Sequence, residues 1–233
     1  MKRLQFCLAV FAVLALPFVL NRSAPGPAGG RVGLVLAVWL VATTLAASSG
    51  GYRPASYEAV PPIGIVLGLA LATLALAVAA FPQVRSVLSN PAAQPRLLAL
   101  QVWRIEGLAF LVLLALGQLP ALFAVPAGVG DLTIGLSAPL IARNLHRRNL
   151  AVAWNLFGLA DLVLAVSLGV TTNPGLLSVF ATTPTSELLT GFPMAIIPTF
   201  LVPLSVGLHV VSLRNLLSAD ARPSGAPALA SSS

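Results

Sequence analysis

The sequence predicts an all-α fold, a polytopic bundle of about seven transmembrane helices. Of the 233 residues, 58% are hydrophobic and only 8% are charged, whereas a soluble domain carries roughly a quarter charged residues. The apolar residues form blocks of about 20, the length that crosses about 30 Å of hydrocarbon as a helix. Proline, glycine and arginine separate these blocks. A water-soluble fold is therefore excluded.

The blocks define the candidate helices in order along the chain. Together they make residues 1–217 a single transmembrane domain without a separate soluble part. The tail 218–233 is rich in Ala, Ser, Pro and Gly, and we expect it to be disordered and cytoplasmic. The seven predicted spans are 4–20, 32–48, 62–81, 97–119, 127–142, 150–170 and 194–213.

The first block, 4–20, has two interpretations. It follows the basic residues Lys2 and Arg3, and its length favours a retained helix. A small-residue site near Ser23 and Ala24 is compatible instead with the cleavage of a signal peptide. Cleavage would leave six spans, and the remaining loops would keep their sides.

Basic residues are distributed unevenly between the two sides of the predicted bundle. With seven spans, one side carries three and the other nine. Cytoplasmic loops are enriched in Lys and Arg, so we expect the N-terminus outside and the C-terminus in the cytoplasm. The abundance of Ala, Gly and Arg with one lysine is typical of a GC-rich bacterial genome, so we expect the membrane to be a bacterial inner membrane. The nine residues are Arg22, Arg31, Arg85, Arg96, Arg143, Arg147, Arg148, Arg214 and Arg222.

A faint internal repeat relates the last four predicted spans. Residues 103–113 and 154–164 share a tryptophan, a glycine and a Leu-Ala pair at the same spacing. The span after each segment ends in Arg-Asn-Leu. The repeat predicts a duplicated helix hairpin in parallel orientation, although chance matches are common in a Leu- and Ala-rich chain.

Several activities need motifs that this sequence lacks. Retinal requires a lysine in the last helix, and the only lysine is Lys2. No Walker, His-Glu-x-x-His or Gly-x-Ser-x-Gly motif is present. The single cysteine, Cys7, cannot form an intrachain disulfide. Haem ligation by His146 and His209 is disfavoured because His146 lies in a basic loop suited to phosphate. We expect no cofactor, no metal and no nucleic-acid partner.

Polar residues inside the predicted spans form the candidate site. Charges in hydrocarbon are costly, and they mark pairing, pathways or binding. Most of these residues lie in the cytoplasmic half or near the midplane, as a buried network or an inward-opening cavity requires. The candidates are Gln101, Arg104, Glu106, Asp131, Asn155, Asp161 and His209.

The candidate residues differ in their predicted depth within the membrane. Arg104 lies about 10 Å from the cytoplasmic end of its span, a distance that a snorkelling arginine can cover, so we expect it to snorkel or to pair helices. Asp161 lies about 17 Å from either end, where aspartate must be protonated, paired or solvated. Its alternatives are a functional group and a structural ion pair. Glu106 points away from Arg104 around the helix and needs its own donor.

The remaining candidates have ordinary interpretations as well. Asp131 follows two glycines at the outer end of a short span, where it is predicted to cap the helix. Alternatively, 126–131 forms an unwound loop facing a cavity. His209 is expected to bond within its helix, with Ser205 one turn away. Asn155 is expected to bond between helices.

Part of the sequence resembles a family of uncharacterised bacterial multi-pass membrane proteins. The resemblance covers 97–213, about half of the chain. It lies in Gln101–Pro139, with Leu119-Pro120 and Pro126-Ala127-Gly128-x-Gly130-Asp131, in Trp154-Asn155 with Gly158–Val163, and in Pro198–His209. It implies a multi-pass membrane fold and no known activity.

Three function hypotheses follow. The first is a transporter-like or small-ligand-binding module with a polar cavity in the last four spans, where Asp161 responds to protons or cations and Arg104 is the counter-ion. The second is a non-catalytic scaffold or accessory subunit, with the charges as helix–helix pairs. The third is an intramembrane enzyme acting on lipid through Glu106, Asp161 or His209. The expected partners are the lipid bilayer and a small solute or another membrane protein.

Overall fold

The computed structural model describes residues 28–53, 62–80 and 93–218. Within these ranges all regular structure is helical, which confirms the all-α prediction. The predicted span 4–20 and nearly all of the predicted tail lie outside the described residues. The elements are α2 (Ala28–Ser48), α3 (Pro62–Ala80), α5 (Gln94–Ala99), η2 (Leu100–Glu106), α6 (Gly107–Ala115), α7 (Ala121–Arg143), α8 (Arg148–Thr171), η3 (Glu187–Thr190), η4 (Ile197–Leu201) and α9 (Val202–Ser218).

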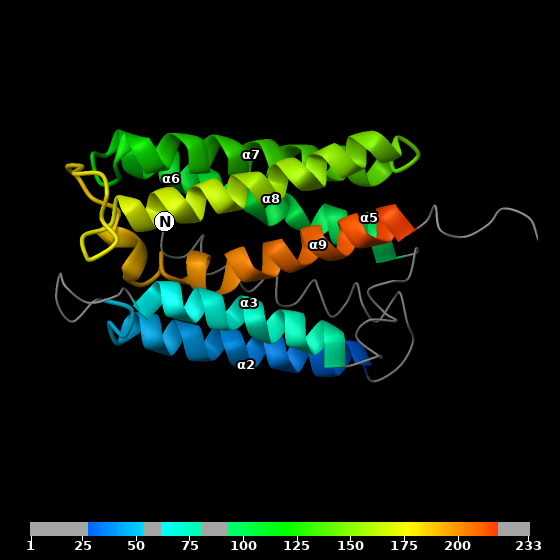
Figure 1. The fold of residues 1–233 in the computed structure, drawn as a ribbon, viewed down its shortest axis with the longest axis horizontal. Coiled ribbons are helices and arrows are strands. Elements are labelled where there is room, and N and C mark those ends of the chain that lie inside the picture. Colours follow the sequence, from blue (N-terminus) through cyan, green and yellow to red (C-terminus); the bar gives the residue numbers. More distant parts are fainter. Residues whose placement is uncertain (1–27, 54–61, 81–92, 219–233) are drawn as a thin grey trace, which may run out of the picture.

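The helices form one elongated bundle with nearly parallel axes (Figure 1). The segments α5, η2 and α6 make one continuous rod, and this rod, α7, α8 and α9 run alternately in opposite directions. Helices α2 and α3 lie together on the α9 side, where α3 packs against α9 and η4. A hydrogen bond of 2.5 Å between Thr43 Oγ1 and Thr199 Oγ1 joins α2 to η4.

Four helical segments are long and apolar enough to cross a membrane. The apolar parts described in α2 and α3 are shorter, 33–48 and 64–73. Six of the seven predicted spans therefore coincide with helices, while the seven-span topology stays a prediction. The four long segments are Gln94–Ala115, Ala121–Arg143, Arg148–Thr171 and Ile197–Ser218.

The fifth predicted span, 127–142, begins too late. Helix α7 starts at Ala121 and continues through Pro126, so the alternative of an unwound loop at 126–131 is wrong. The chain break lies earlier, at Gly117, whose φ is +65°. Gly117 N–H donates to Leu114 O (2.9 Å) and Gln118 N–H to Leu113 O (2.8 Å). These two bonds form the glycine-dependent stop that ends many helices.

Two segments depart from α-helical geometry. The 3₁₀ helix η2 is seven residues long, more than the three or four usual for this conformation. Gly135 of α7 lies so close to it that a Cβ there would be 2.6 Å from Ile105 N. Further along, η4 is a π-helical turn in which Val202 N–H donates to Ile197 O. The next residue, Pro203, has no N–H for an α-helical bond.

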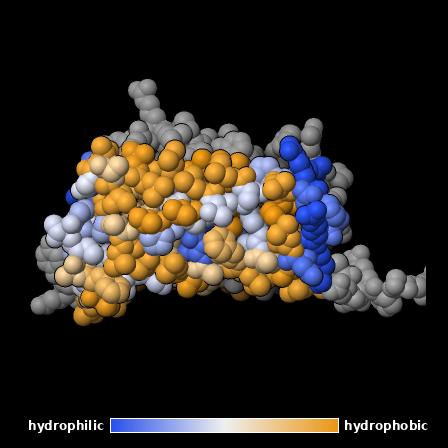
Figure 2. Space-filling model, turned by 90° about the horizontal axis from the view of Figure 1, so that it is seen from above, coloured by the Kyte–Doolittle hydropathy of each residue, from blue (hydrophilic) through white to orange (hydrophobic). Residues whose placement is uncertain are grey.

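Large apolar side chains face outward along the long helices, and Val163 of α8 is 67% exposed. Figure 2 shows a broad hydrophobic surface with hydrophilic residues gathered at one end. At that end Arg96, Arg143, Arg147 and Arg214 are exposed. The opposite end has Arg53 and Glu187 as its described charged residues.

Candidate functional site

Arg104 of η2 lies at the centre of a buried network. Its Nε donates to Asp131 Oδ1 at 2.6 Å, and its Nη2 donates to Asp161 Oδ2. Its Nη1 lies 3.2 Å from His209 Nε2 and 3.4 Å from Gly158 O. The residue is 0% exposed. Of the two ordinary roles expected for Arg104, snorkelling is wrong and helix pairing is confirmed, because the guanidinium turns toward two carboxylates on other helices rather than toward the membrane surface.

The two carboxylates come from different helices. Asp131 lies ten residues inside α7, too far from the N-terminus at Ala121 to cap it, so the predicted capping role is wrong. Asp161 lies near the middle of α8, as expected, and it is ion-paired. Both side chains are largely buried. One arginine thus joins η2, α7 and α8 through two ion pairs.

His209 extends the network from α9. Arginine nitrogens only donate hydrogen bonds, so the contact with Arg104 Nη1 makes His209 Nε2 the acceptor. The ring proton then lies on Nδ1, which donates to Asn155 Oδ1 at 3.0 Å. Asn155 Nδ2 donates in turn to Ala151 O at 2.8 Å. We call Arg104, Asp131, Asp161, His209 and Asn155 the charge cluster.

Gln101 lies one turn before Arg104 and outside the charge cluster. It accepts from Ser205 Oγ at 2.5 Å, and its Nε2 donates to Ser205 O at 3.2 Å. Ser205 therefore bonds with η2 rather than with His209, which differs from the expectation. A second polar contact that the sequence did not indicate joins Gln94 Nε2 to Ser212 Oγ at 2.7 Å. Both contacts attach α9 to the first rod.

Glu106 is the candidate that the structure leaves without a partner. It is 2% exposed, and neither carboxyl oxygen has a hydrogen-bond partner within the described residues. It makes no hydrogen bond to Arg104, and the donor of its own that it was predicted to need is not found within the described residues. A third buried carboxyl group thus lies close to the charge cluster without joining it.

Three glycines make room for the charged side chains. A Cβ on Gly130 of α7 would overlap the Asp161 carboxylate, and one on Gly158 of α8 would overlap the His209 ring. A Cβ on Gly107 would lie 2.5 Å from Asp131 Cβ. At Gly158 a histidine side chain, rather than another backbone, fills the space. A larger residue at any of these three positions would occupy space that a polar side chain of the charge cluster now fills.

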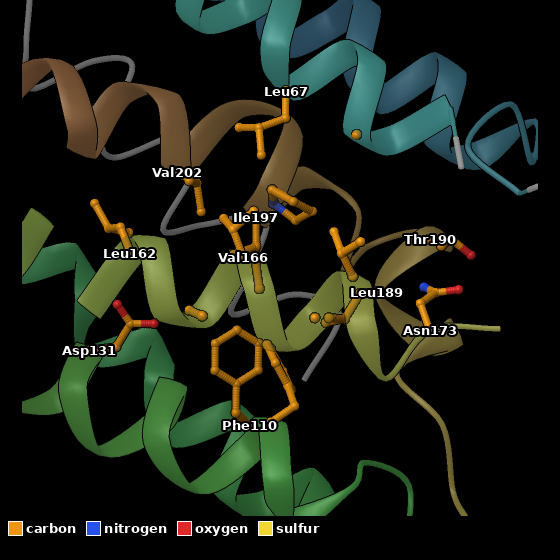
Figure 3. A pocket seen from close by; sticks show the side chains of 16 residues that line it. Leu67, Phe110, Asp131, Leu162, Val166, Asn173, Leu189, Thr190, Ile197 and Val202 are labelled. Carbon is orange, nitrogen blue, oxygen red and sulfur yellow. The ribbon is translucent and has the colours of Figure 1, made fainter. Parts of the chain in front are cut away.

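A cavity of about 70 Å³ adjoins the charge cluster at Asp131 (Figure 3). Asp131 lies at one end, and Asn173 and Thr190 lie at the other. Most of the wall between them is apolar, so the expected polar cavity is largely apolar. We call it the α3–α8 cavity. It is lined by Gly64, Leu67, Phe110, Phe123, Asp131, Leu162, Ala165, Val166, Gly169, Val170, Asn173, Leu189, Thr190, Ile197, Pro198 and Val202.

The cavity extends away from the arginine-rich end, because Asn173 follows the far end of α8 and Leu189 and Thr190 belong to η3. Under the predicted orientation this direction is outward, whereas one of the two alternatives for these residues was an inward-opening cavity and the other a buried network. Sequence reasoning did not indicate Asn173 or Thr190, which follow the predicted span 150–170 in a polar connection. Their burial, at 4% and 1% exposed, is the signal that marks them in the structure.

Residues 60–217 match a protein family described as a domain of unknown function, DUF8737. The match covers more than half of the chain. The chain belongs to this family. No curated protein and no solved structure matches the chain.

The DUF8737 segment contains the whole candidate site. It begins just before α3 and ends within α9. It includes all seven residues predicted from the sequence and every residue that lines the α3–α8 cavity. Helix α2 lies before it. The charge cluster and the cavity therefore belong to the family region of the chain.

Proposed function

We propose that the chain is a multi-pass protein of a bacterial inner membrane, and that its charge cluster binds a proton or a cation within a transporter-like or small-ligand-binding module. The observation that carries this proposal is the excess of acid in the cluster. Arg104 supplies one positive charge, while Asp131 and Asp161 supply two carboxyl groups. A structural ion pair needs only one of them.

The excess of acid matters because both carboxyl groups are buried. An unpaired carboxylate away from water is far more costly than a neutral or paired one. The cluster therefore holds a proton or a cation to balance the second carboxylate, and losing or exchanging it changes the state of the bundle. Asp161 is the responsive group in this scheme, and Arg104 is the counter-ion. Glu106 is a further carboxyl group for the same proton or cation.

The surface supports membrane insertion. Exposed apolar patches of this extent are rare on soluble monomers, and the four long segments have the length and hydropathy of spans. The arginine-rich end fits the cytoplasmic side, since cytoplasmic loops are enriched in basic residues. The alternating directions of the four rods also agree with the proposed duplicated hairpin.

The experiment measures the thermal stability of the full-length protein in nanodiscs between pH 5 and 8, with Na⁺ or K⁺ varied at constant ionic strength. We expect the wild-type melting temperature to depend on pH or on one of these cations. Asp161→Asn removes the excess carboxylate and should flatten this dependence. Glu187→Gln, which neutralises an exposed acid, is the matched control and should retain it.

Transport is measured on the same variants in liposomes that contain a pH-sensitive dye, under an imposed membrane potential. A wild-type flux above that of empty liposomes, lost in Asp161→Asn, would support the transporter-like form. If the melting temperatures of wild type and Asp161→Asn respond identically to pH and cations, the proposed role of the cluster is wrong.

A scaffold or accessory subunit is the second candidate, and the network geometry favours it. The Arg104 donors meet groups from α7, α8 and α9, so the cluster ties these helices together. In this function Arg104→Gln lowers the yield of folded protein. Adding Asp131→Asn and Asp161→Asn, which removes the unpaired charges, should restore it. If the triple variant recovers the yield of folded protein, and the wild-type melting temperature does not respond to pH or cations, the scaffold function is favoured.

A further inference from the structure

The α3–α8 cavity has room for a small molecule. A water occupies roughly 10–15 Å³ of such space, so about 70 Å³ holds five to seven groups of that size. Exposed Gly64 and partly exposed Val170 line the cavity, which leaves a way in between α3 and α8. An occupant therefore has at most about seven non-hydrogen atoms.

One acid of the charge cluster faces this cavity. Asp131 lines it, and one of its carboxyl oxygens points toward the other lining residues (Figure 3). Arg104 Nε donates to Oδ1 of Asp131, whereas Oδ2 has no hydrogen bond within the described residues. The same arginine also pairs with Asp161, so the two carboxylates exceed it by one negative charge. A cation beside Oδ2 balances this excess.

An aromatic pair lies next to Asp131. A Cβ on Gly107 would lie 2.5 Å from Asp131 Cβ, and Phe110 follows one turn later on the same face of α6. Phe110 lines the cavity together with Phe123, and the two ring centroids are 5.1 Å apart in an edge-to-face arrangement. Aromatic rings attract cations through their negative faces. The carboxylate and the rings together favour a positively charged ligand.

The other walls of the cavity restrict the kind of cation. Most of them are aliphatic, with Leu162, Val166 and Ile197 among the lining residues. A primary ammonium group has three N–H donors, and Asp131 Oδ2 has lone pairs for about two of them. A buried donor without an acceptor is costly. A quaternary ammonium ion carries the same charge without any N–H group, and it is the kind of cation that aromatic sites recognise best.

We infer that the α3–α8 cavity binds a small quaternary ammonium ion, with its positive charge between Asp131 Oδ2 and the Phe110 ring. This inference deepens the proposed function and rests on it, because the ammonium ion is the cation that balances the charge cluster. Tetramethylammonium is within the size limit of the cavity, whereas tetrapropylammonium is well above it.

The test measures the binding of radiolabelled tetramethylammonium by equilibrium dialysis. The full-length protein is held in dodecyl maltoside micelles, which contain no ammonium group, and protein-free micelles give the background. We expect saturable binding of one ion per chain. Unlabelled n-butylammonium, an isomer with the same charge, should displace the label only at about tenfold higher concentration than unlabelled tetramethylammonium, because its N–H groups lack acceptors. Tetrapropylammonium and the uncharged molecule tert-butanol should not displace it.

Matched variants locate the site. Ala165→Phe places a ring in the cavity and should abolish binding, whereas Ala160→Phe, at an exposed position of α8, should leave it unchanged. Phe110→Leu keeps an apolar side chain but removes the aromatic face, and it should weaken binding of tetramethylammonium about tenfold. Phe157→Leu, at an exposed position of α8, is its control and should bind like the wild type.

A charge variant tests the contact with Asp131. Asp131→Asn keeps the shape of the side chain but removes its charge, so Arg104 then balances Asp161 alone. Binding of tetramethylammonium should weaken about a hundredfold. Glu187→Gln removes an exposed negative charge outside the cavity and should leave binding unchanged.

Each contrary result overturns the inference. Displacement by n-butylammonium at the same concentration as tetramethylammonium would show that the site does not select against N–H donors. Displacement by tert-butanol at that concentration would exclude recognition of charge. Equal binding by Ala165→Phe and Ala160→Phe, or wild-type binding by Asp131→Asn, would place the ion outside the cavity. The pH, Na⁺ and K⁺ series contains no ammonium ion, so failure there contradicts the proposed function separately from these binding results.

Discussion

A single side chain, that of Arg104, makes both ion pairs of the charge cluster. The planar guanidinium has five donors in a rigid fork, and here they serve two carboxylates, a histidine and a backbone carbonyl. A lysine at this position carries the same charge on a single nitrogen. It lacks the geometry to meet partners from three helices. The site therefore depends on the shape of the cation as well as on its charge.

Arg104→Leu is expected to lower the free energy of unfolding by about 3–5 kcal/mol, because it leaves two buried carboxylates without a partner. Arg104→Lys should fall between this variant and the wild type. The measurement is thermal unfolding of the protein in nanodiscs. Retention of wild-type stability in Arg104→Leu would contradict the ion pairs described for Asp131 and Asp161.

Gly130→Ala tests the close packing at the charge cluster. The new methyl group would overlap the Asp161 carboxylate, so the variant is expected to lose about 1–3 kcal/mol of stability. Gly68→Ala is the matched control in α3, where a Cβ meets nothing within 4 Å. It should be neutral or slightly stabilising, since alanine favours a helix over glycine. A smaller loss for Gly130→Ala than for Gly68→Ala would contradict the packing.

At the residue scale, the depth of a polar residue in its helix could be predicted from the sequence, but the residues with which it pairs could not. Position along α8 placed Asp161 at the centre of its span, because the rise per residue is fixed. The pairing of Arg104 with Asp131 and Asp161 depends on how three helices rotate against one another, which local sequence does not encode. Asn173 escaped notice because a polar residue in a connecting segment is ordinarily exposed.

At the element scale, the contact between the first rod and α9 rests on polar pairs. Gln101 meets Ser205, and Gln94 meets Ser212. In the proposed membrane, such pairs replace the hydrophobic driving force that is missing between helices in lipid. They hold η2, with Arg104 and Glu106, against α9. The 3₁₀ segment therefore keeps its register even where its own backbone bonds are less favourable than those of an α-helix.

Ser205→Ala leaves Gln101 Oε1 buried without its donor, and we expect it to cost about 1–3 kcal/mol of stability. Gln101→Leu with Ser205→Ala removes both polar groups and should recover most of that loss. The check is a double-mutant cycle on melting temperature. Additive losses from the two substitutions would show that this pair does not couple η2 to α9.

The existence of the helices could be predicted from the sequence, but the ends of some of them could not. Blocks of about 20 apolar residues are a local signal, so α2, α3 and the four long segments follow from the sequence. The start of α7 was misplaced because Pro126 and the glycines after it are typical of a break. In the structure Pro120 and Gly117 make the turn instead, and the glycines after Pro126 serve close packing against α6 and Asp161.

On the scale of the whole molecule, charge is divided between the two ends. Five arginines near the ends of α5, α7, α8 and α9 lie at one end, whereas the described part of the other end has Arg53 and Glu187. The α3–α8 cavity points toward the second end. If the arginine-rich end is cytoplasmic, the cavity lies in the outer half of the bundle, and a ligand reaches Asp131 from that half.

Cysteine labelling tests this orientation in a Cys7→Ser background. Ala181→Cys, in the loop after α8, should react with a membrane-impermeant maleimide on spheroplasts. Asn149→Cys, at the arginine-rich end, should react only after the membrane is permeabilised. Both positions are exposed in the structure, so access alone decides the outcome. The reverse labelling pattern would invert the proposed topology.

Arg104 precedes both of its acidic partners in the chain, and this order bears on how the protein is made. During synthesis the segment Gln94–Ala115 emerges before α7 and α8. In the proposed membrane, an arginine at that depth costs about 2.5–3.5 kcal/mol on insertion scales, and the compensating carboxylates arrive one and two helices later. We expect the first rod to wait beside the insertion machinery until α8 has entered. Biogenesis of the bundle is then cooperative over three helices.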